Sequence, residues 1–344
     1  MVDHCTVCGH TADEVYKNVF RKLIAHGTET DGRMHKGGSS GRNLEFLHVC
    51  LHIANPIERW VTCRNPGISP AFAVAELLMI MNGSDDASLL NAWNHSLPIY
   101  LGNYENYPGA YGKRLRFSFG FDQLNRAYQV LGENCNTRQV VLQIWNPSLD
   151  MPKEDGCPQN TDIPCNVCSL LKIRENKLMW TQIMRSNDII MGMPYNFIQF
   201  MSLQEIIAGW LGVGVGEYTH FSDSLHLYCD QKDCYTVKER ATCLLNTDRL
   251  ALSKKDSDEV FKEMFEKFTE LSSQKLLIWQ LKEITLSLKS LPQAYRNLMI
   301  LLCEYVAVKR KSIDLIQLCE SLNTNKLLSE LMKDWMMRRG IDIQ

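Results

Sequence analysis

Three side chains between residues 163 and 188 have types that suit chemistry on a phosphorylated substrate. Cys165, directly after Ile163-Pro164, is a potential nucleophile, and Arg185 could lower the pKa of a nearby thiol and favour the reactive thiolate. Arg185 and Ser186 together are suited to hold a phosphate through charge-assisted hydrogen bonds. This pattern indicates covalent catalysis on a phosphate-bearing molecule.

Four further side chains could recognise a nucleotide or transfer protons. Asn196, at the start of a predicted helix, can present a donor and an acceptor to a pyrimidine edge. His226 and Tyr228 are two residues apart on a predicted strand, so they share one face and could both meet a sugar. Glu76 lies inside an apolar helical segment, where an unpaired carboxylate is costly to bury. That cost favours a functional role for Glu76.

The elements that must position these residues follow from periodicity in the sequence. Apolar residues at helical spacing predict helices, and alternation predicts strands. The predicted helices are 12–26, 70–83 and 194–213, and the predicted strands are 44–53, 139–147 and two within 168–186, joined by a turn at Glu175–Asn176. The polar, glycine-rich segment 27–43 is expected to be a mobile loop. This order predicts an α+β fold with a mainly antiparallel or mixed sheet.

The chain changes character near residue 250. From Ser253 to Arg339, apolar residues recur three and four apart, with Lys and Glu between them. This spacing predicts a helical appendage with the size of a small bundle. We therefore expect a catalytic domain over residues 1–250 and a helical C-terminal extension over residues 251–344, which serves packing or oligomerisation.

The composition limits the class of protein. Of the 344 residues, 45% are hydrophobic and 22% charged, and the net charge of −2 argues against a protein that coats a polyanion. No apolar run approaches the roughly 20 residues of a membrane helix, and the amino terminus lacks the layout of a signal peptide. The 13 cysteines show no regular spacing. They predict a reducing compartment, so we expect a cytoplasmic protein.

In their order, these motifs resemble the thymidylate synthase superfamily, which includes the pyrimidine hydroxymethylases. Six motifs over roughly residues 12–230 carry the resemblance. They are Ala75-Glu76-Leu77-Leu78, Gly109-Ala110-Tyr111-Gly112-Lys113, Thr137-Arg138-Gln139 before Trp145-Asn146, Cys165 with Arg185-Ser186-x-Asp188, Gly192-x-Pro194-x-Asn196, and His226-x-Tyr228. The resemblance implies a three-layer fold with a mixed sheet, a homodimer, and 5,10-methylenetetrahydrofolate as cofactor.

The resemblance also implies roles in the reaction. Cys165 would attack C6 of the pyrimidine, which makes C5 nucleophilic toward the methylene of the folate. Glu76 would organise water and proton transfers around the base and the folate, and Tyr111 would assist removal of the C5 proton. Asn196 would bind the base at N3 and O4.

Ligands for the phosphate follow from the same resemblance. Arg185 and Ser186 would bind the 5′-phosphate, and Arg138 would reach it from the other subunit of the homodimer. Members of the family also keep a phosphate-binding arginine on the loop that corresponds to residues 27–43. Among the cations of this loop, Arg42 is our choice over Arg33 and Lys36.

Ligands for the sugar and the folate are also implied. His226 and Tyr228 would hold the 3′-hydroxyl of the deoxyribose. Asp188 would hold the pterin, with Gly192 and Glu76 in the same folate site.

Four departures from the thymidylate-forming members concern the last step of the reaction. Asn166 replaces a His after the nucleophile, and Gln139 replaces a second arginine. Residues 97–107 lack the tryptophans of the folate pocket, and the chain ends RRGIDIQ rather than in an apolar closing tail. Thymidylate synthases exclude water so that the folate reduces the exocyclic methylene at C5. The departures favour addition of water, so we expect a hydroxymethylase.

The base is expected to be uracil. The segments around Arg185 and His226 also resemble the phage deoxycytidylate hydroxymethylase, which carries Asp where this chain has Asn196. An Asn amide can complement uracil N3–H and O4, whereas a carboxyl group suits the cytosine amino edge. We therefore expect a dUMP hydroxymethylase that supplies 5-hydroxymethyl-dUMP for modified DNA, in the host cytoplasm if phage-encoded, without membrane or direct nucleic-acid contacts. The alternatives are a thymidylate synthase, a dCMP hydroxymethylase, and a catalytically silent scaffold protein.

Two cysteine clusters could in principle bind a metal. Cys5, Cys8 and His10 beside His4 resemble a zinc knuckle, as do three cysteines beyond the last motif, Cys229, Cys234 and Cys243. Two Cys and one His provide only three ligands, whereas structural zinc takes four. We therefore expect free thiols and no metal.

Overall fold

The computed structural model describes residues 5–31, 41–239, 244–273 and 275–340. Their strands form one eight-stranded mixed sheet and a small two-stranded sheet, which confirms the predicted α+β class. The strands are β1 (Thr6–Gly9), β2 (Thr28–Asp31), β3 (Arg42–Ile53), β4 (Arg64–Asn65), β5 (Val141–Gln143), β6 (Asn166–Arg174), β7 (Lys177–Met184), β8 (Asn187–Asp188), β9 (Gly214–Tyr228) and β10 (Thr236–Val237).

The large sheet has the order β1-β3-β9-β7-β6-β5, with β2 added beside β3 and β8 beside β9. Strand β9 runs antiparallel to β3 and parallel to β7 and β8, so the sheet is mixed at its centre. Strands β6 and β7 form the predicted hairpin. Its turn residues Glu175 and Asn176 have positive φ values of 51° and 55°, the conformation that matches the twist of two paired strands.

Two predictions for the strands need correction. Strand β5 is shorter than the predicted 139–147, because Asn146 caps the next helix and Pro147 begins it. Residues 28–31, expected in a mobile loop, form strand β2, which pairs with the start of β3 from Thr28 opposite Glu45 to Asp31 opposite Arg42. The strand has no apolar alternation because it lies at an edge. Residues 32–40 of the predicted loop lie outside the described residues.

The predicted helices 12–26, 70–83 and 194–213 agree with the structure to within two residues at each end, whereas the helices between residues 87 and 150 were not predicted. Helix α2 (Pro70–Asn82) is capped by Ser69, has Pro70 in its first turn and ends at Gly83, whose φ of 67° favours glycine. The helices are α1 (Ala12–His26), α2 (Pro70–Asn82), α3 (Ala87–Asn91), α4 (Leu97–Leu101), α5 (Tyr111–Arg116), α6 (Gln123–Glu133), α7 (Pro147–Asp150), α8 (Met193–Leu211), α9 (Lys254–Ser272), α10 (Ile278–Ser287), α11 (Gln293–Lys309), α12 (Ile313–Leu322) and α13 (Lys326–Arg338).

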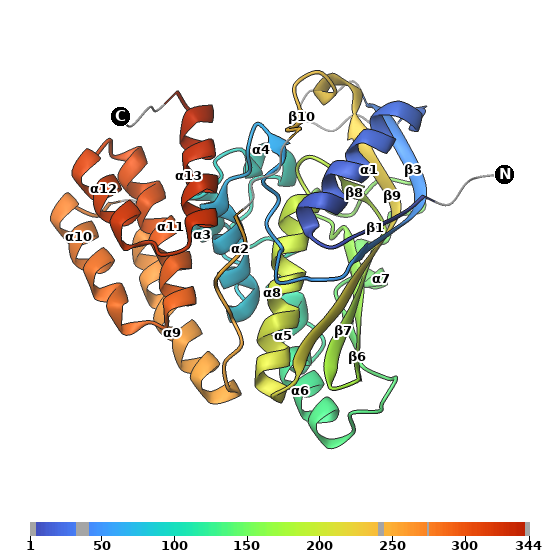
Figure 1. The fold of residues 1–344 in the computed structure, drawn as a ribbon. Helices are drawn as coiled ribbons and strands as arrows, with labels where there is room; N and C mark the ends of the chain where they lie inside the picture. The colour runs from blue at the N-terminus through green and yellow to red at the C-terminus, as the bar shows by residue number, and fades with distance from the viewer. Residues whose placement is uncertain (1–4, 32–40, 240–243, 274, 341–344) are drawn as a thin grey trace.

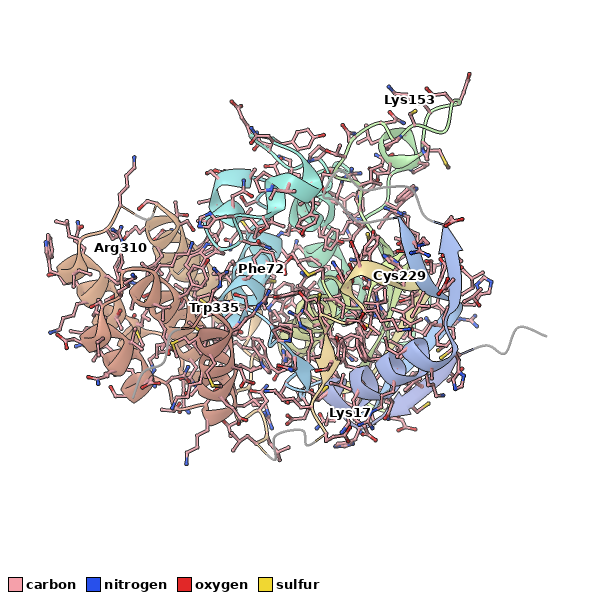
Figure 2. The ribbon with its side chains drawn as sticks, turned by 90° about the horizontal axis from the view of Figure 1, so that it is seen from above. Lys17, Phe72, Lys153, Cys229, Arg310 and Trp335 are labelled. Atoms are coloured by element: carbon pink, nitrogen blue, oxygen red, sulfur yellow. The ribbon has the colours of Figure 1, made fainter. Side chains whose placement is uncertain are left out.

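Helices α8, α2, α9, α11 and α13 lie in successive layers on one side of the sheet (Figure 1). Helix α8 packs on β7 and β9, α2 packs on α8, and α9, α11 and α13 pack on α2. Seen from above, Phe72 of α2 lies between Trp335 and Arg310 of the C-terminal helical region on one side and Lys17 and Cys229 on the other (Figure 2). One apolar core therefore continues from the sheet into the C-terminal helices. The division into two domains at residue 250 stays a prediction.

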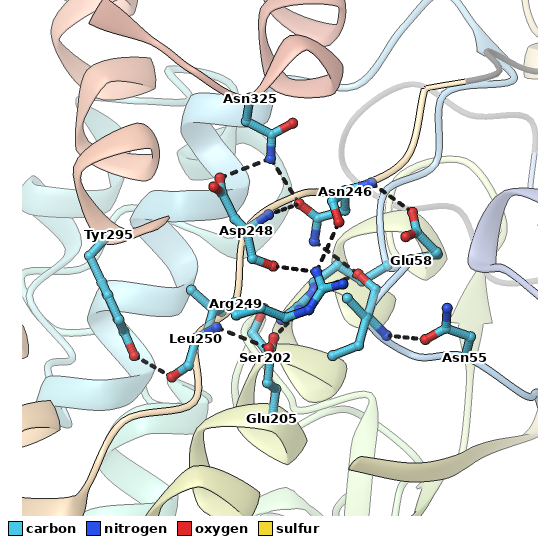
Figure 3. Close-up of polar contacts among 12 residues, drawn as sticks. Asn55, Glu58, Ser202, Glu205, Asn246, Asp248, Arg249, Leu250, Tyr295 and Asn325 are labelled. Atoms are coloured by element: carbon cyan, nitrogen blue, oxygen red, sulfur yellow. Dashed lines mark hydrogen bonds and ion pairs between the residues drawn. The ribbon is translucent and has the colours of Figure 1, made fainter. Parts of the chain in front are cut away.

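A buried polar cluster joins the C-terminal helices to the rest of the molecule (Figure 3). Arg59 and Glu205 form an ion pair in which both side chains are at most 2% exposed, and Arg59 also donates to Ser202 Oγ at 2.9 Å. Glu205 accepts the backbone N–H of Leu250 at 3.0 Å, and the Leu250 carbonyl accepts the Tyr295 hydroxyl at 2.5 Å. The extended segment before α9 is thereby tied to α8 and to α11.

The 12 cysteines within the described residues are all free. None of the helices in the described ranges is long and apolar enough to cross a membrane.

Candidate active site

Cys165 lies directly before β6, at the mouth of the hairpin formed by β6 and β7. Its carbonyl accepts the backbone N–H of Arg185 at 3.0 Å, which joins the residues that precede β6 to those that follow β7. Burial raises the pKa of the Cys165 thiol, and nearby Asp188 and Asp162 add to the rise, while Arg185 opposes it. The contribution of Arg185 has the expected sign, but burial outweighs it. The thiol is therefore protonated at neutral pH.

The Arg185 guanidinium folds over the segment that carries the thiol. Its Nε donates to the Pro164 carbonyl at 3.0 Å and its Nη2 to the Ile163 carbonyl at 3.3 Å. The guanidinium also lies 5.2 Å from the centre of the Trp145 ring. A guanidinium has five N–H donors, so this arrangement leaves donors for a phosphate. Ser186 follows on the same turn and is partly exposed.

Glu76 presents a buried carboxyl group from α2. Gln199 of α8 hydrogen bonds to it, but Glu76 Oε2 and Gln199 Oε1 are both buried without a hydrogen-bond partner among the described residues. Burial raises the pKa of Glu76 to about 8. The carboxyl group is therefore mostly protonated at neutral pH and can both donate and accept a proton.

Tyr111 begins α5 and is brought close to Glu76 by a tight helix contact. A Cβ on Gly112 would lie 2.4 Å from the Met79 carbonyl of α2, so glycine at this position lets α5 approach α2. Burial raises the pKa of Tyr111, and the neighbouring Cys165 raises it further, while a hydrogen bond with Asn166 opposes the rise. The hydroxyl is therefore a neutral group beside the thiol.

Asn196 lies in the first turn of α8 and is 5% exposed. Its Oδ1 accepts from Asn166 Nδ2 at 3.2 Å, and its Nδ2 donates to Asn187 Oδ1 at 3.3 Å. The turn before α8 is fixed by Asp188, whose Oδ1 accepts the backbone N–H groups of Ile190 at 2.7 Å and Met191 at 2.9 Å. The amide is therefore held by neighbours on both sides.

His226 and Tyr228 lie on the same face of β9, as predicted. Their ring centres are 5.3 Å apart, and the rings are nearly perpendicular. The pairing of β8 with β9 places Asp188 opposite His226. Burial raises the pKa of Tyr228, and Asp188 and Cys165 contribute to the rise. The pair therefore lies within electrostatic reach of the thiol.

The structure does not bring every predicted residue to this site. Arg138 is exposed between α6 and β5, and Arg42 is exposed at the start of β3. Within the described residues, neither arginine contacts Cys165 or the side chains described around it. Arg33 and Lys36 lie outside the described residues. The roles of these cations in phosphate binding stay predictions.

Sequence reasoning missed several buried polar residues around the site. Asp162 accepts the Gly109 N–H at 2.8 Å, and burial raises the pKa of its carboxyl group to about 6. Asn187, Gln182 and His220 are at most 1% exposed. A signal for the last two exists, because each occupies the buried phase of a strand whose alternate residues face the core.

The structure describes only part of the two cysteine clusters that resemble zinc sites. No group of three His, Cys, Asp or Glu side chains is placed to hold a metal ion within the residues that the structure describes. His4 and Cys243 lie outside that part of the chain.

Known proteins of one family are similar in sequence to this chain. Residues 14–299 match the family model described as thymidylate synthase. A deoxyuridylate hydroxymethyltransferase of Bacillus phage SP01 is 32% identical over 236 residues, which cover 65% of this chain and 59% of the relative. A second protein of that name, from Pseudomonas phage M6, is 31% identical over 50% of this chain and 48% of its own length.

A thymidylate synthase of Francisella philomiragia subsp. philomiragia is 28% identical over 62% of this chain and 79% of its own length. The matched region thus spans about half to three-fifths of the two phage relatives. The family model, in contrast, covers most of the present chain and includes Cys165, helix α2 with Glu76, and Asn196 of α8. The chain therefore belongs to the thymidylate synthase family, a family of folate-dependent pyrimidine C5 transferases.

Proposed function

We propose that this chain is a dUMP hydroxymethylase that converts dUMP to 5-hydroxymethyl-dUMP. Cys165 attacks C6 of the uracil, and Tyr111 assists removal of the C5 proton. 5,10-Methylenetetrahydrofolate, when bound, would supply the one-carbon unit as a methylene group on C5 and would leave as tetrahydrofolate. Water then adds to the new carbon, and the thiolate leaves C6.

The residues around Glu76 fit a folate. Glu76 Oε2 and Gln199 Oε1 are buried polar atoms without a partner in the described chain, and such atoms cost free energy unless a ligand or water satisfies them. In the turn that opens α8, the Gly192 N–H donates to the Asp188 carbonyl at 3.0 Å. These residues would hold the cofactor, and Glu76 would exchange protons with water or with the base.

The observation that carries the choice of uracil is the orientation of Asn196. Its Oδ1 and Nδ2 each make one contact with a neighbouring amide, and each atom keeps the capacity for one more hydrogen bond. One acceptor and one donor suit N3–H and O4 of uracil. The names of the two phage relatives support the same choice.

The position of Trp93 supports water addition over reduction. This tryptophan precedes the Trp-free segment 97–107, but its ring is only 3% exposed and stacks on Phe268 at 5.8 Å. Its Nε1 donates to Ser272 Oγ at 3.0 Å. The indole thus packs against α9 and is not available to stack on a folate. The second candidate is thymidylate synthase, which the Francisella relative favours by its name and coverage.

Four partly buried residues, together with the exposed Arg138, are proposed to bind the phosphate and the sugar. Arg185 and Ser186 bind the 5′-phosphate, and Arg138 completes this site from the other subunit of a homodimer. His226 and Tyr228 bind the 3′-hydroxyl. The protein acts in the cytoplasm, where its free thiols stay reduced.

One incubation with dUMP and 5,10-methylenetetrahydrofolate tests the proposed function. The expected products are 5-hydroxymethyl-dUMP and tetrahydrofolate, identified by mass and by the absence of dihydrofolate absorbance. Stoichiometric dTMP and dihydrofolate would instead support thymidylate synthase. Turnover of dCMP in preference to dUMP would contradict the choice of uracil. Failure to release tritium from C5-labelled dUMP or dCMP would support a silent scaffold protein.

A further inference from the structure

Asn196 lies in the middle of a continuous chain of buried side-chain hydrogen bonds. These hydrogen bonds connect side chains from β7, β6, α8, β8 and β9. Its members are at most 5% exposed and are, in order, Trp180, Gln182, Asn166, Asn196, Asn187 and His220. The five links have donor–acceptor distances between 2.9 and 3.3 Å.

The direction of this chain matters because a side-chain amide has two orientations. Uracil presents a donor at N3 and an acceptor at O4, whereas cytosine presents an acceptor at N3 and a donor at its amino group. An amide that rotates by half a turn exchanges its donor and its acceptor. A freely rotating Asn196 could therefore complement either base, whereas a fixed amide complements one.

Trp180 sets the direction at one end. Its indole N–H can only donate, and it lies 3.1 Å from Gln182 Oε1. Gln182 must therefore turn its NH2 group toward Asn166 Oδ1, at 2.9 Å. Asn166 is left with Nδ2 for Asn196, which accepts on Oδ1 at 3.2 Å.

His220 is compatible with the same direction at the other end, because a neutral imidazole can accept on Nε2. Asn187 accepts from Asn196 on Oδ1, so its Nδ2 meets His220 Nε2 at 3.0 Å. Burial lowers the pKa of His220 to about 3, which keeps the ring neutral. Its Nδ1 lies 2.9 Å from the Tyr218 hydroxyl, so Nδ1 can carry the proton while Nε2 accepts. A reversed chain of hydrogen bonds would place two donors together at Trp180, and at His220 it would require the other tautomer of the ring, with the Tyr218 hydroxyl donating to Nδ1.

The packing around Asn196 also leaves little space. A Cβ on Gly192 would lie 3.2 Å from Asn187 Oδ1 and 3.4 Å from Asn196 Nδ2. The link between these two amides is therefore covered closely by the backbone at the start of α8.

We propose that Trp180 and His220 are positioning residues that hold the Asn196 amide in a single orientation and so restrict the site to uracil over cytosine. The proposal rests on the proposed function, because it requires Asn196 to meet the base. Discrimination between uracil and cytosine would then depend on the two end residues of the hydrogen-bond chain, although neither of them contacts the base.

Two variants remove the ends of the chain with little change of shape. Trp180→Phe deletes the indole N–H and keeps an aromatic ring, and His220→Leu deletes the acceptor. The control is Leu171→Val, because Leu171 is buried opposite Trp180 in the pairing of β6 with β7 but has no polar atom in its side chain. The readout is tritium release from C5-labelled dUMP and dCMP, expressed as the ratio of the two kcat/KM values.

The ratio is expected to fall about tenfold or more in the double variant and less in each single variant, because loss of the fixed amide admits the wrong base. Part of this change should be a gain in dCMP turnover, which destabilisation alone would not produce. The control should keep the wild-type ratio. Since both substrates are measured on one preparation, partial unfolding cancels from the ratio.

Wild-type ratios in both Trp180→Phe and His220→Leu would overturn the positioning role. The tritium assay reports proton removal whether the product is hydroxymethylated or methylated, so the outcome does not depend on the fate of the one-carbon unit. A wild-type preference for dCMP would contradict the uracil assignment of the proposed function. The change of ratio among the variants would then still decide whether the chain orients Asn196.

Discussion

The raised pKa of Glu76 leads to a measurable dependence of stability on pH. The folded-state pKa of about 8 lies above the ordinary value of 4.5 because the carboxyl group is buried. The contribution of the protonated carboxyl group to the free energy of unfolding is therefore complete below pH 4.5 and is lost as the pH rises toward 8. The side chain in Glu76→Gln cannot ionise, so this position should cause no loss of unfolding free energy over the same pH range.

The size of the effect follows from the shift. Between pH 4.5 and pH 8, the wild-type protein should lose about 4 kcal/mol relative to Glu76→Gln, if the pKa moves from 4.5 to about 8 on folding. Other titrating groups cancel when the variant is compared with wild type at each pH. The assay is urea unfolding of both proteins at several pH values across this range.

Glu304 provides a matched control for this experiment. It lies in α11, is 1% exposed, and has a pKa that burial raises to about 8. Glu304→Gln should therefore show the same stability trend with full activity. Glu76→Gln should lower kcat by about 10²–10⁴-fold, because the amide cannot transfer a proton. A stability difference that stays constant with pH for Glu76→Gln, while Glu304→Gln shows the trend, would refute the assignment of a buried, protonated Glu76.

Three further predictions concern the nucleophile, the base and the junction with the C-terminal helices. Cys165→Ser should abolish the covalent adduct with 5-fluoro-dUMP and 5,10-methylenetetrahydrofolate detected by mass spectrometry, and an undiminished adduct would exclude Cys165 as the nucleophile. Asn196→Asp should move the kcat/KM preference from dUMP toward dCMP, and an unchanged preference would argue against contact with the base. Arg59→Met should cost about 3–5 kcal/mol of unfolding free energy because it leaves Glu205 buried without its partner. The exposed pair of Arg21 with Glu239 serves as control, since Arg21→Ala should leave stability unchanged, and equal losses in the two variants would contradict the role of burial.

The fold was predictable where local rules decide it. Gly83 closes α2 and the Glu175–Asn176 turn joins β6 to β7, because positive φ values are required at both places. Strand β2 escaped prediction because its four residues, Thr28–Asp31, are polar and are held by pairing with β3. Pairing between distant segments leaves no local pattern in a sequence.

The site was predictable in its residue types but not in its electrostatics. The motifs around Cys165 and Asn196 were identified from their order along the chain. The rise in the pKa of the Cys165 thiol was missed because it results from burial, which depends on tertiary packing. The chain of hydrogen bonds between Trp180 and His220 was missed for a related reason. The parallel register that sets Gln182 opposite His220 is fixed only when β7 pairs with β9.

The source of the oxygen in the product tests the central proposal most directly. The enzyme would be incubated with dUMP and 5,10-methylenetetrahydrofolate in water enriched in heavy oxygen, and the nucleotide product would be analysed by mass spectrometry. Because water adds to the new carbon in the proposed reaction, the product should be 5-hydroxymethyl-dUMP that carries the heavy oxygen in its hydroxymethyl group. A product identified as dTMP without the label, formed together with dihydrofolate, would contradict the proposal.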